Sequence, residues 1–317
     1  MKALEAITTV YSYYLPEIRA LISRMTHDYP HDVFLRSIKP GLDDFHVPII
    51  DRLTAVHARS LPGLEEFSNR YPTAGSEEGI REYMTHLRNR GVESIYVWCG
   101  EYEGYREVAK TRGLSVCEVA YTQDPAELTP GHWFLSNPSA RNGLFVPEEK
   151  IQGVLQAGHK VFYDLSYLSS TAPHIYNLDH PNVDAAAISF SKPFGLFYYR
   201  IGFLYSRAQV PVLYANKWFK NVFGLLIAQR LLEEIDLPAL AARYKALQAQ
   251  IVADINRDCG LELIESDAFL LAHLPKEKVE RLNSTQRESI ARFQRGDDYR
   301  FCLTPFFEAQ EREQAST

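Results

Sequence analysis

The stretch SFSKPFGLFYYRIG, residues 189–202, decides the fold; it runs from Ser189 through Lys192 and Arg200 to Gly202. Its only lysine lies among aromatic and apolar residues, and burial there disfavours the ammonium form of an amine. A neutral lysine amine can form a Schiff base with a carbonyl compound. The Ser189 hydroxyl and the Arg200 guanidinium are donors suited to a phosphate group. An ordinary loop, with a lysine that extends to solvent and a surface arginine, is an equally good interpretation of these residues alone.

Composition and charge limit the class of protein. The chain has 317 residues, of which 46% are hydrophobic and 23% charged, as in globular proteins. Its net charge of −6 argues against nucleic acid as a partner. We expect no membrane span and no signal peptide, because no apolar run is long enough and residues 1–16 lack the signal pattern. The four scattered cysteines predict neither a disulfide framework nor a metal site, and they favour a cytoplasmic location.

Strands that alternate with helices are predicted in the middle of the chain. Short apolar strands are expected at residues 94–98, 114–119, 131–135, 160–164, 184–189 and 201–205, with helices at 47–61, 76–90, 102–112 and 147–157. This order predicts a mostly parallel sheet with helices on both faces, a three-layer α/β/α arrangement. Residues 1–24 have helical spacing that Pro16 should break or kink. Residues 28–48 give mixed signals.

The last third of the chain has a different character. Helical periodicity is expected at residues 217–235 and 238–257, followed by strand signals at 260–274 and 299–303. The polar tail from Glu308 onward is predicted to fray. The predicted domains are an N-terminal arm that forms part of the small domain at 1–45, a large domain at 46–215, and a small α+β domain at 216–317.

Polar and aromatic residues follow the predicted strands, at the edge where a parallel sheet binds its ligands. These residues are Tyr102, Asn137, Asp164, Tyr167 and Lys192. Each of three has a simpler interpretation: Tyr102 as a core residue, Asn137 with Pro138 as a turn, and Asp164 as a helix N-cap. Taken singly, none of them decides the function.

Taken in order, they resemble the pyridoxal-phosphate enzymes of fold type I, the aspartate aminotransferase superfamily. The motifs that carry the resemblance are Gly75-Ser76, Tyr102, Asn137-Pro138, Asp164-x-x-Tyr167, Ser189-x-x-Lys192, Arg200-x-Gly202 and a late arginine, Arg300. The resemblance spans roughly residues 70–303, and the lysine segment is its strongest part. It implies the transferase fold of these enzymes, with residues 46–215 as the domain that binds pyridoxal 5'-phosphate.

The resemblance also implies a role for each residue. Lys192 holds the cofactor as a Schiff base and moves the substrate proton, and Asp164 pairs with the pyridine nitrogen. Tyr167 and Asn137 hydrogen-bond the ring oxygen O3′, and Tyr102 stacks on the ring. Arg300, with Asn137, binds the substrate; the alternative for Arg300 is a surface salt bridge to neighbouring aspartates. The residues implied for the phosphate are Ala74, Gly75, Ser76, Ser189 and Arg200.

The function implied is a pyridoxal-phosphate-dependent aminotransferase that acts on an amino acid, with a keto acid as a possible second substrate. A second hypothesis keeps the cofactor but changes the reaction to decarboxylation, elimination, cyclisation or oxidation, because the small domain is trimmed. A third, a cofactor-binding sensor or structural protein without turnover, ranks last. The resemblance implies a homodimer with its site at the interface, for which the aromatic residues at 198–199 and 214–223 would supply contact area; monomer core is their equal alternative.

Overall fold

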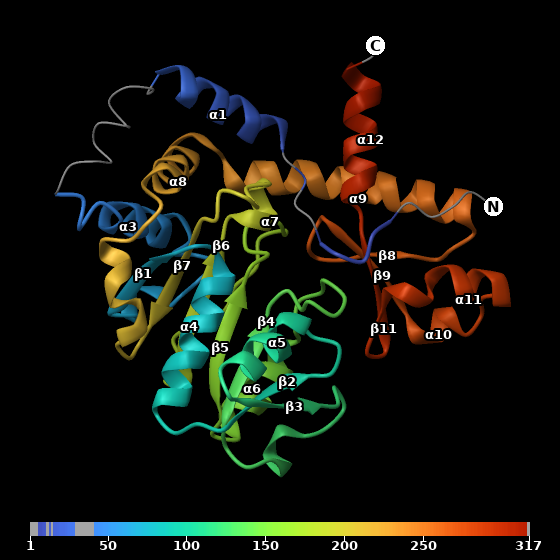
Figure 1. Cartoon of the computed structure of the whole chain (residues 1–317). Helices are drawn as coiled ribbons and strands as arrows, with labels where there is room; N and C mark the ends of the chain where they lie inside the picture. The colour runs from blue at the N-terminus through green and yellow to red at the C-terminus, as the bar shows by residue number, and fades with distance from the viewer. Residues whose placement is uncertain (1–5, 11–12, 14, 29–40, 316–317) are drawn as a thin grey trace.

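The structure is a computed structural model that describes residues 6–10, 13, 15–28 and 41–315. Two β-sheets organise this part of the chain. Within these ranges, a large sheet has seven strands in the order β1-β7-β6-β5-β4-β2-β3, and a small sheet has four in the order β10-β11-β9-β8 (Figure 1). The strands of the large sheet are β1 (Asn69–Thr73), β2 (Ser94–Trp98), β3 (Ser115–Val119), β4 (His132–Ser136), β5 (Lys160–Leu165), β6 (Val183–Ser189) and β7 (Gly202–Ser206).

Most of the large sheet is parallel, as the alternation of strands and helices predicts. The strands β2 to β6 run parallel, whereas β7 is antiparallel to both of its neighbours, β6 and β1. The sequence does not predict β1, because that strand contains Pro72 and has no apolar alternation. Proline is tolerated there because β1 lies at the edge of the sheet.

Helices cover both faces of the large sheet. The helices of one face are α4 (Ser76–Asn89) and α5 (Glu103–Thr111), and those of the other are α3 (Val47–Val56), α6 (Glu148–Gln156) and α8 (Val222–Glu234). Successive strand residues enter different cores: Trp133 and Leu135 pack in the cluster with α3, α6 and α8, while Phe134 packs with α4 and α5. The predicted three-layer α/β/α fold is confirmed.

A smaller α+β part follows the long helix α9 (Leu237–Cys259), as predicted (Figure 1). Its strands are β8 (Ile264–Glu265), β9 (Leu271–Pro275), β10 (Gln294–Arg295) and β11 (Asp298–Cys302), and its helices are α10 (Lys276–Val279), α11 (Ser284–Ile290) and α12 (Thr304–Ala315). The prediction of a frayed tail from Glu308 is wrong. The helix α12 continues to Ala315, and it is anchored because Phe307 is buried against the rings of Tyr13 and Tyr244.

The N-terminal part differs from the helix predicted at residues 1–24. Residues 6–10 are not helical, and Ile7 forms an isolated bridge with Cys302 of β11. The helix α1 (Pro16–Asp28) starts at Pro16 instead of being broken there, because the first turn of a helix needs no backbone N–H from its proline. Residues 1–5, 11–12, 14 and 29–40 lie outside the described ranges. The helix α3 ends at Val56, before the predicted limit at residue 61.

The four cysteines all lie among the described residues, and none of them is in a disulfide bond. In the part of the chain that is described, no helix has the length and apolar character needed to cross a bilayer. The same part holds no group of three or more His, Cys, Asp or Glu side chains that could bind a metal ion.

A buried ion pair joins the two sheets. Arg141, in the loop after β4, lies 3.2 Å from the carboxylate of Asp298 on β11, and the two side chains are only 6% and 17% exposed. The side-chain amide of Asn142 donates to the same carboxylate at 2.9 Å. Asp298 therefore fixes the loop after β4 against the small sheet.

Replacing Asp298 with alanine should lower the free energy of unfolding by about 3 kcal/mol, because it leaves the buried Arg141 guanidinium without its charged partner. Urea denaturation measures this change. The neighbouring Asp297 is the matched control, since it is 76% exposed and lies 3.5 Å from the exposed Lys276. Asp297→Ala should change the unfolding free energy by less than about 1 kcal/mol. Equal losses in the two variants would contradict the assignment of Asp298 as the joint between the sheets.

Candidate active site

Three neighbouring strands bring most of the predicted residues to one edge of the large sheet. Asn137 follows β4, Asp164 lies near the end of β5, and Lys192 follows β6. The backbone N–H of Asn137 donates to the backbone carbonyl of Asp164 at 3.1 Å. Because parallel strands end at the same edge, these side chains start from adjacent positions.

Lys192 lies between two aromatic rings. It belongs to the short helical turn α7 (Ser191–Phe194), which ends at Gly195 with a φ of 70°. Its Nζ is 4.5 Å from the ring centroid of Tyr167 and 5.8 Å from that of Tyr102. Tyr167 is buried, and Tyr102 is 36% exposed, so Tyr102 is not the core residue of the simpler interpretation. The amine is therefore held over ring faces and not extended freely into solvent.

Asp164 is buried and receives three hydrogen bonds. The Tyr105 hydroxyl donates to Oδ2 at 2.9 Å, and the Ser166 backbone N–H donates to Oδ1 at 3.1 Å. The Ser166 hydroxyl also donates to Oδ1. Burial raises the pKa of Tyr105 well above its ordinary value, which keeps this phenol protonated as a donor. These donors fix the plane of the carboxylate, and Asp164 caps no helix.

A second group of residues meets where α4 begins. Gly75 precedes α4 with φ 83° and ψ 173°, a conformation that only glycine adopts readily. Arg200 also has a positive φ of 53°, and its Nη2 donates to the Ala74 carbonyl at 2.7 Å. A Cβ on Gly75 would lie 2.7 Å from that Nη2, so the guanidinium is directly over the glycine. Gly202 pairs with both Thr73 and Ser189, which brings Ser189 to the same place.

Two predicted phosphate contacts have partners within the protein. The Ala74 backbone N–H donates to the carboxylate of Glu78, on the first turn of α4. The Ser76 hydroxyl is 2.7 Å from the Ser166 hydroxyl. A phosphate bound at Gly75 would therefore compete with Glu78 and Ser166 for these donors, while the Arg200 guanidinium keeps further N–H groups available.

Asn137 carries an unused donor. Its side chain is 1% exposed, and its Oδ1 accepts a hydrogen bond from the Val146 backbone N–H at 3.1 Å. Its Nδ2 finds no hydrogen-bond partner among the described residues. A buried amide donor left without an acceptor destabilises the fold, so this position suits an acceptor atom of a ligand.

Arg300 is buried beside the same loop. Its Nη1 donates to the Ala140 carbonyl, and its Nη2 donates to the Thr8 carbonyl at 3.0 Å. Its Nε finds no partner in the described part of the chain. The alternative interpretation of Arg300, a surface salt bridge to the neighbouring aspartates, is wrong, because Asp298 pairs with Arg141 and Asp297 pairs with Lys276.

Three residues of this region are missed by the sequence interpretation. Tyr105 and Ser166 hold Asp164, as described above. Glu101 is buried and accepts hydrogen bonds from Ser136 and Ser139 in the loop that contains Asn137; burial raises its pKa. Tyr105 is one helical turn from Tyr102, and Ser166 is two residues from Asp164, so spacing gives a signal for both. No sequence signal points to Glu101.

A cavity of about 200 Å³ opens beside Tyr102, between α5 and the β10–β11 hairpin. Its wall includes Tyr105 and Glu101, and the ion pair of Glu103 with Arg295 joins α5 to the hairpin at 2.8 Å. The hairpin is in close contact there, since a Cβ on Gly100 would lie 2.7 Å from the Arg295 backbone. The small sheet thus covers the edge that holds Tyr102.

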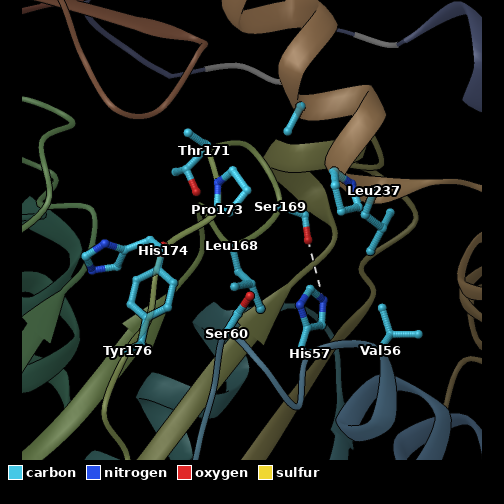
Figure 2. A pocket seen from close by; sticks show the side chains of 13 residues that line it. Val56, His57, Ser60, Leu168, Ser169, Thr171, Pro173, His174, Tyr176 and Leu237 are labelled. Atoms are coloured by element: carbon cyan, nitrogen blue, oxygen red, sulfur yellow. Dashed lines mark hydrogen bonds between the residues drawn. The ribbon is translucent and has the colours of Figure 1, made fainter.

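A separate cavity of about 90 Å³ lies between α3, α9 and the loop after Tyr167 (Figure 2). His57 and Ser169 point toward one another in it, with 3.4 Å between His57 Nε2 and Ser169 Oγ. None of the predicted site residues lines this cavity, although Leu168, which directly follows Tyr167, does. Burial lowers the pKa of His57 to about 4.

This lowered pKa predicts that the fold loses stability in acid. His57 is neutral in the folded protein above pH about 4, whereas in the unfolded chain it takes up a proton below pH about 6.5. Between these values the unfolded state binds more protons, so stability is fully present above pH about 6.5 and falls as the pH drops toward 4. The loss should approach about 3 kcal/mol. Urea denaturation across this window should show a flatter profile for His57→Gln; unchanged profiles would contradict the burial of His57.

The fold is similar to solved structures of pyridoxal-phosphate enzymes. Histidinol-phosphate aminotransferase from Sinorhizobium meliloti, solved in complex with pyridoxal-5'-phosphate, matches with a TM-score of 0.66 and 18% identity, over 93% of this chain and 85% of that one. L-threonine-O-3-phosphate decarboxylase from Porphyromonas gingivalis matches with a TM-score of 0.65 and 15% identity, over 98% and 99%. The Escherichia coli protein YbdL, with a methionine aminotransferase function, matches with a TM-score of 0.67 and 14% identity, over 94% of this chain and 89% of that one.

No protein-family model and no curated protein matches the sequence. At 14–18% identity the structural likeness establishes the fold alone. The fold type expected from the lysine segment is therefore confirmed: this chain has the fold of these pyridoxal-phosphate enzymes.

Proposed function

We propose that this protein is a pyridoxal-phosphate-dependent aminotransferase that acts on an amino acid. The observation that carries the proposal is the position of the Lys192 amine, over the rings of Tyr167 and Tyr102. It lies on the sheet edge where the Asp164 carboxylate is held by hydrogen bonds. The unpartnered Nδ2 of Asn137 supports the fit of the cofactor, because the ring oxygen O3′ is an acceptor that this buried donor lacks.

Each residue of the site then has a defined task. When bound, the cofactor supplies an electron sink for the charge that develops at the substrate Cα. Lys192 Nζ would bind the cofactor, and it would move the proton from the substrate Cα to C4′. Asp164 would keep the proton on the pyridine nitrogen, and Asn137 and Tyr167 would donate to O3′. Tyr102 would cover one face of the ring and exclude water from it.

The phosphate would lie at the start of α4. Gly75 leaves room for the Arg200 guanidinium, and this guanidinium would donate to the phosphate together with the Ser189 and Ser76 hydroxyls and the backbone at Ala74. In this proposal, residues 46–215 form the cofactor domain, residues 216–317 form the small domain, whose first helix α8 packs on the large sheet, and residues 1–45 form an arm that belongs partly to the small domain. Arg300 would then bring the small domain to the substrate.

Arg300 would bind the α-carboxylate of the substrate with N–H groups left over from its two carbonyl contacts. Arg300→Ala should therefore raise KM for an amino acid by about a hundredfold, the loss of one charge-assisted pair. Steady-state kinetics measure this change. The nearby Arg292, which donates to the Ala6 carbonyl at 3.4 Å, is the control, and Arg292→Ala should leave KM within about twofold. An unchanged KM in Arg300→Ala would contradict this role.

A second candidate reaction keeps the same site. Decarboxylation is favoured by one observation: one of the similar structures is an L-threonine-O-3-phosphate decarboxylase, which matches over 98% of this chain and 99% of its own. Elimination, cyclisation and oxidation belong to the same alternative, because each begins with removal of a group from the substrate Cα.

A panel of amino acids, each with and without a keto acid, tests the proposal. Transamination predicts a new keto acid from the amino donor and a new amino acid from the keto acid, both identified by mass. Release of carbon dioxide, with an amine as product, would support decarboxylation instead. If the purified protein with added pyridoxal phosphate changes no amino acid in the panel, the enzymatic proposal is wrong.

The proposal includes a homodimer with the active site at its interface, and a cytoplasmic location. Aromatic side chains between residues 198 and 219 are unusually exposed: Tyr198 by 88%, Phe219 by 81% and Tyr214 by 55%. Exposed aromatic residues of this kind are typical of protein interfaces. Sedimentation should give the mass of a dimer for the unchanged protein and of a monomer for Phe219→Asp; a monomeric unchanged protein would rule this part out.

A further inference from the structure

A hydrogen-bond chain links the start of α4 to the end of β5. The Ser76 and Ser166 hydroxyl oxygens are 2.7 Å apart, and the Ser166 hydroxyl donates to Oδ1 of Asp164. Ser166 is 4% exposed, and its backbone N–H donates to the same oxygen at 3.1 Å. The chain thus runs from a residue at the proposed phosphate site to the carboxylate proposed for the ring nitrogen.

The number of hydrogens fixes the direction of this chain. A serine hydroxyl has one hydrogen to donate. Because Ser166 gives its hydrogen to Asp164, Ser76 must be the donor in the bond between the two serines. The only hydroxyl hydrogen of Ser76 therefore points at Ser166. A phosphate oxygen at Gly75 would need that same hydrogen, since phosphate oxygens are acceptors.

We propose that Ser166 is a positioning residue that couples the phosphate site to Asp164. The inference rests on the proposed function, and it adds a competition between two acceptors for one hydrogen. When Ser76 donates to the phosphate, Ser166 loses its donor and keeps Asp164 as its own acceptor. When no phosphate is present, the chain from Ser76 through Ser166 to Asp164 is complete.

Two forms of the cofactor separate these effects: pyridoxal phosphate, and pyridoxal, which has the same ring without the phosphate. Ser166→Ala removes one donor from Asp164, so the affinity for pyridoxal should fall by about tenfold. The affinity for pyridoxal phosphate should fall less, because Ser76 is then free to donate to the phosphate. The ratio of the two affinities should therefore shift by about fivefold in favour of the phosphorylated form.

Ser76→Ala should act in the opposite direction. It removes a donor from the phosphate site and lowers the affinity for pyridoxal phosphate, with little change for pyridoxal. The double variant carries both Ser76→Ala and Ser166→Ala. Because it has no Ser76 hydroxyl hydrogen to release, adding Ser166→Ala to Ser76→Ala should lower the affinities for pyridoxal and pyridoxal phosphate by the same factor. The loss of the ratio shift in the double variant is the signature of the coupling.

Equilibrium dialysis of the full chain with each cofactor form measures these affinities. Ser170→Ala is the matched control, because Ser170 is equally buried in the same loop but donates to the Tyr167 carbonyl; its ratio should equal that of the unchanged protein. Equal losses of both forms in Ser166→Ala, or a ratio shift that persists in the double variant, would overturn the coupling. If the unchanged protein binds neither form, the proposed function fails instead, so the two failures are distinguishable.

A variant that does not fold is recognised by circular dichroism. If Ser166→Ala does not fold, Ser76→Ala alone decides: a ratio of the two affinities equal to that of the unchanged protein overturns the inference.

Discussion

Lys192→Ala should abolish turnover, with kcat lowered by at least about a thousandfold, because this amine both binds the cofactor and moves the substrate proton. Its Nζ is the amine that lies over the rings of Tyr167 and Tyr102. The measurement is the rate of product formation with the best amino acid of the panel. The visible absorption that a bound cofactor gives to the unchanged protein should disappear in the same variant.

Lys150 provides the control for this substitution. Its Nζ is 5.1 Å from the ring centroid of Tyr121, so it is also a lysine over an aromatic ring, but it belongs to α6. Lys150→Ala should keep both turnover and the absorption band. If Lys192→Ala kept them as well, the reactive amine would have to be another lysine.

Asp164→Asn should lower kcat by about a thousandfold, which corresponds to about 4 kcal/mol in the activation free energy. An amide has nearly the same shape as the carboxylate, but it lacks the negative charge that would hold the proton on the pyridine nitrogen. Ser166 would still donate to the amide oxygen, and the Tyr105 hydroxyl would have to rotate to accept a hydrogen bond from the amide nitrogen. Steady-state kinetics with saturating cofactor measure the loss.

The control is Asp184→Asn, on the neighbouring strand β6. Asp184 lies 3.6 Å from Lys160 and is at the opposite end of the sheet from Lys192. Its substitution should leave kcat within about twofold. A rate for Asp164→Asn that equals the rate for Asp184→Asn would mean that Asp164 does not act on the cofactor.

The alternation of strands and helices predicts most of the large sheet, because each buried strand is a short apolar run between helices. The predicted strand at residues 94–98 has the limits of β2, and the strand at 160–164 differs from β5 by one residue. The edge strand β1 is different. It lies at the rim with Pro72 and three half-buried residues, so it lacks the apolar pattern on which the prediction depends.

The lysine segment predicts which of its residues lie near one another, because residues close in sequence are close in space. Ser189, Lys192 and Gly202 lie on or beside two paired strands, and Gly202 faces Ser189 directly. The contacts made across long distances in sequence are not predictable in this way. Glu101 holds the loop after β4, and Asp298 pairs with Arg141 from the small sheet, through contacts that only the folded chain brings together.

The sequence also does not identify polar residues whose partners are other polar side chains. In the sequence Ser166 does not differ from other small polar loop residues, and the role proposed for it depends on the direction of one hydrogen bond. A count of donors and acceptors in the folded site is needed to find it.

The most direct test of the account is to reduce the protein with borohydride in the presence of pyridoxal phosphate, digest it and map the labelled peptide by mass. Reduction fixes a carbonyl cofactor to the lysine that binds it as a stable secondary amine. We predict a single label, on Lys192, in the peptide that contains residues 189–202. A label on a different lysine, or no label at all, would contradict the account.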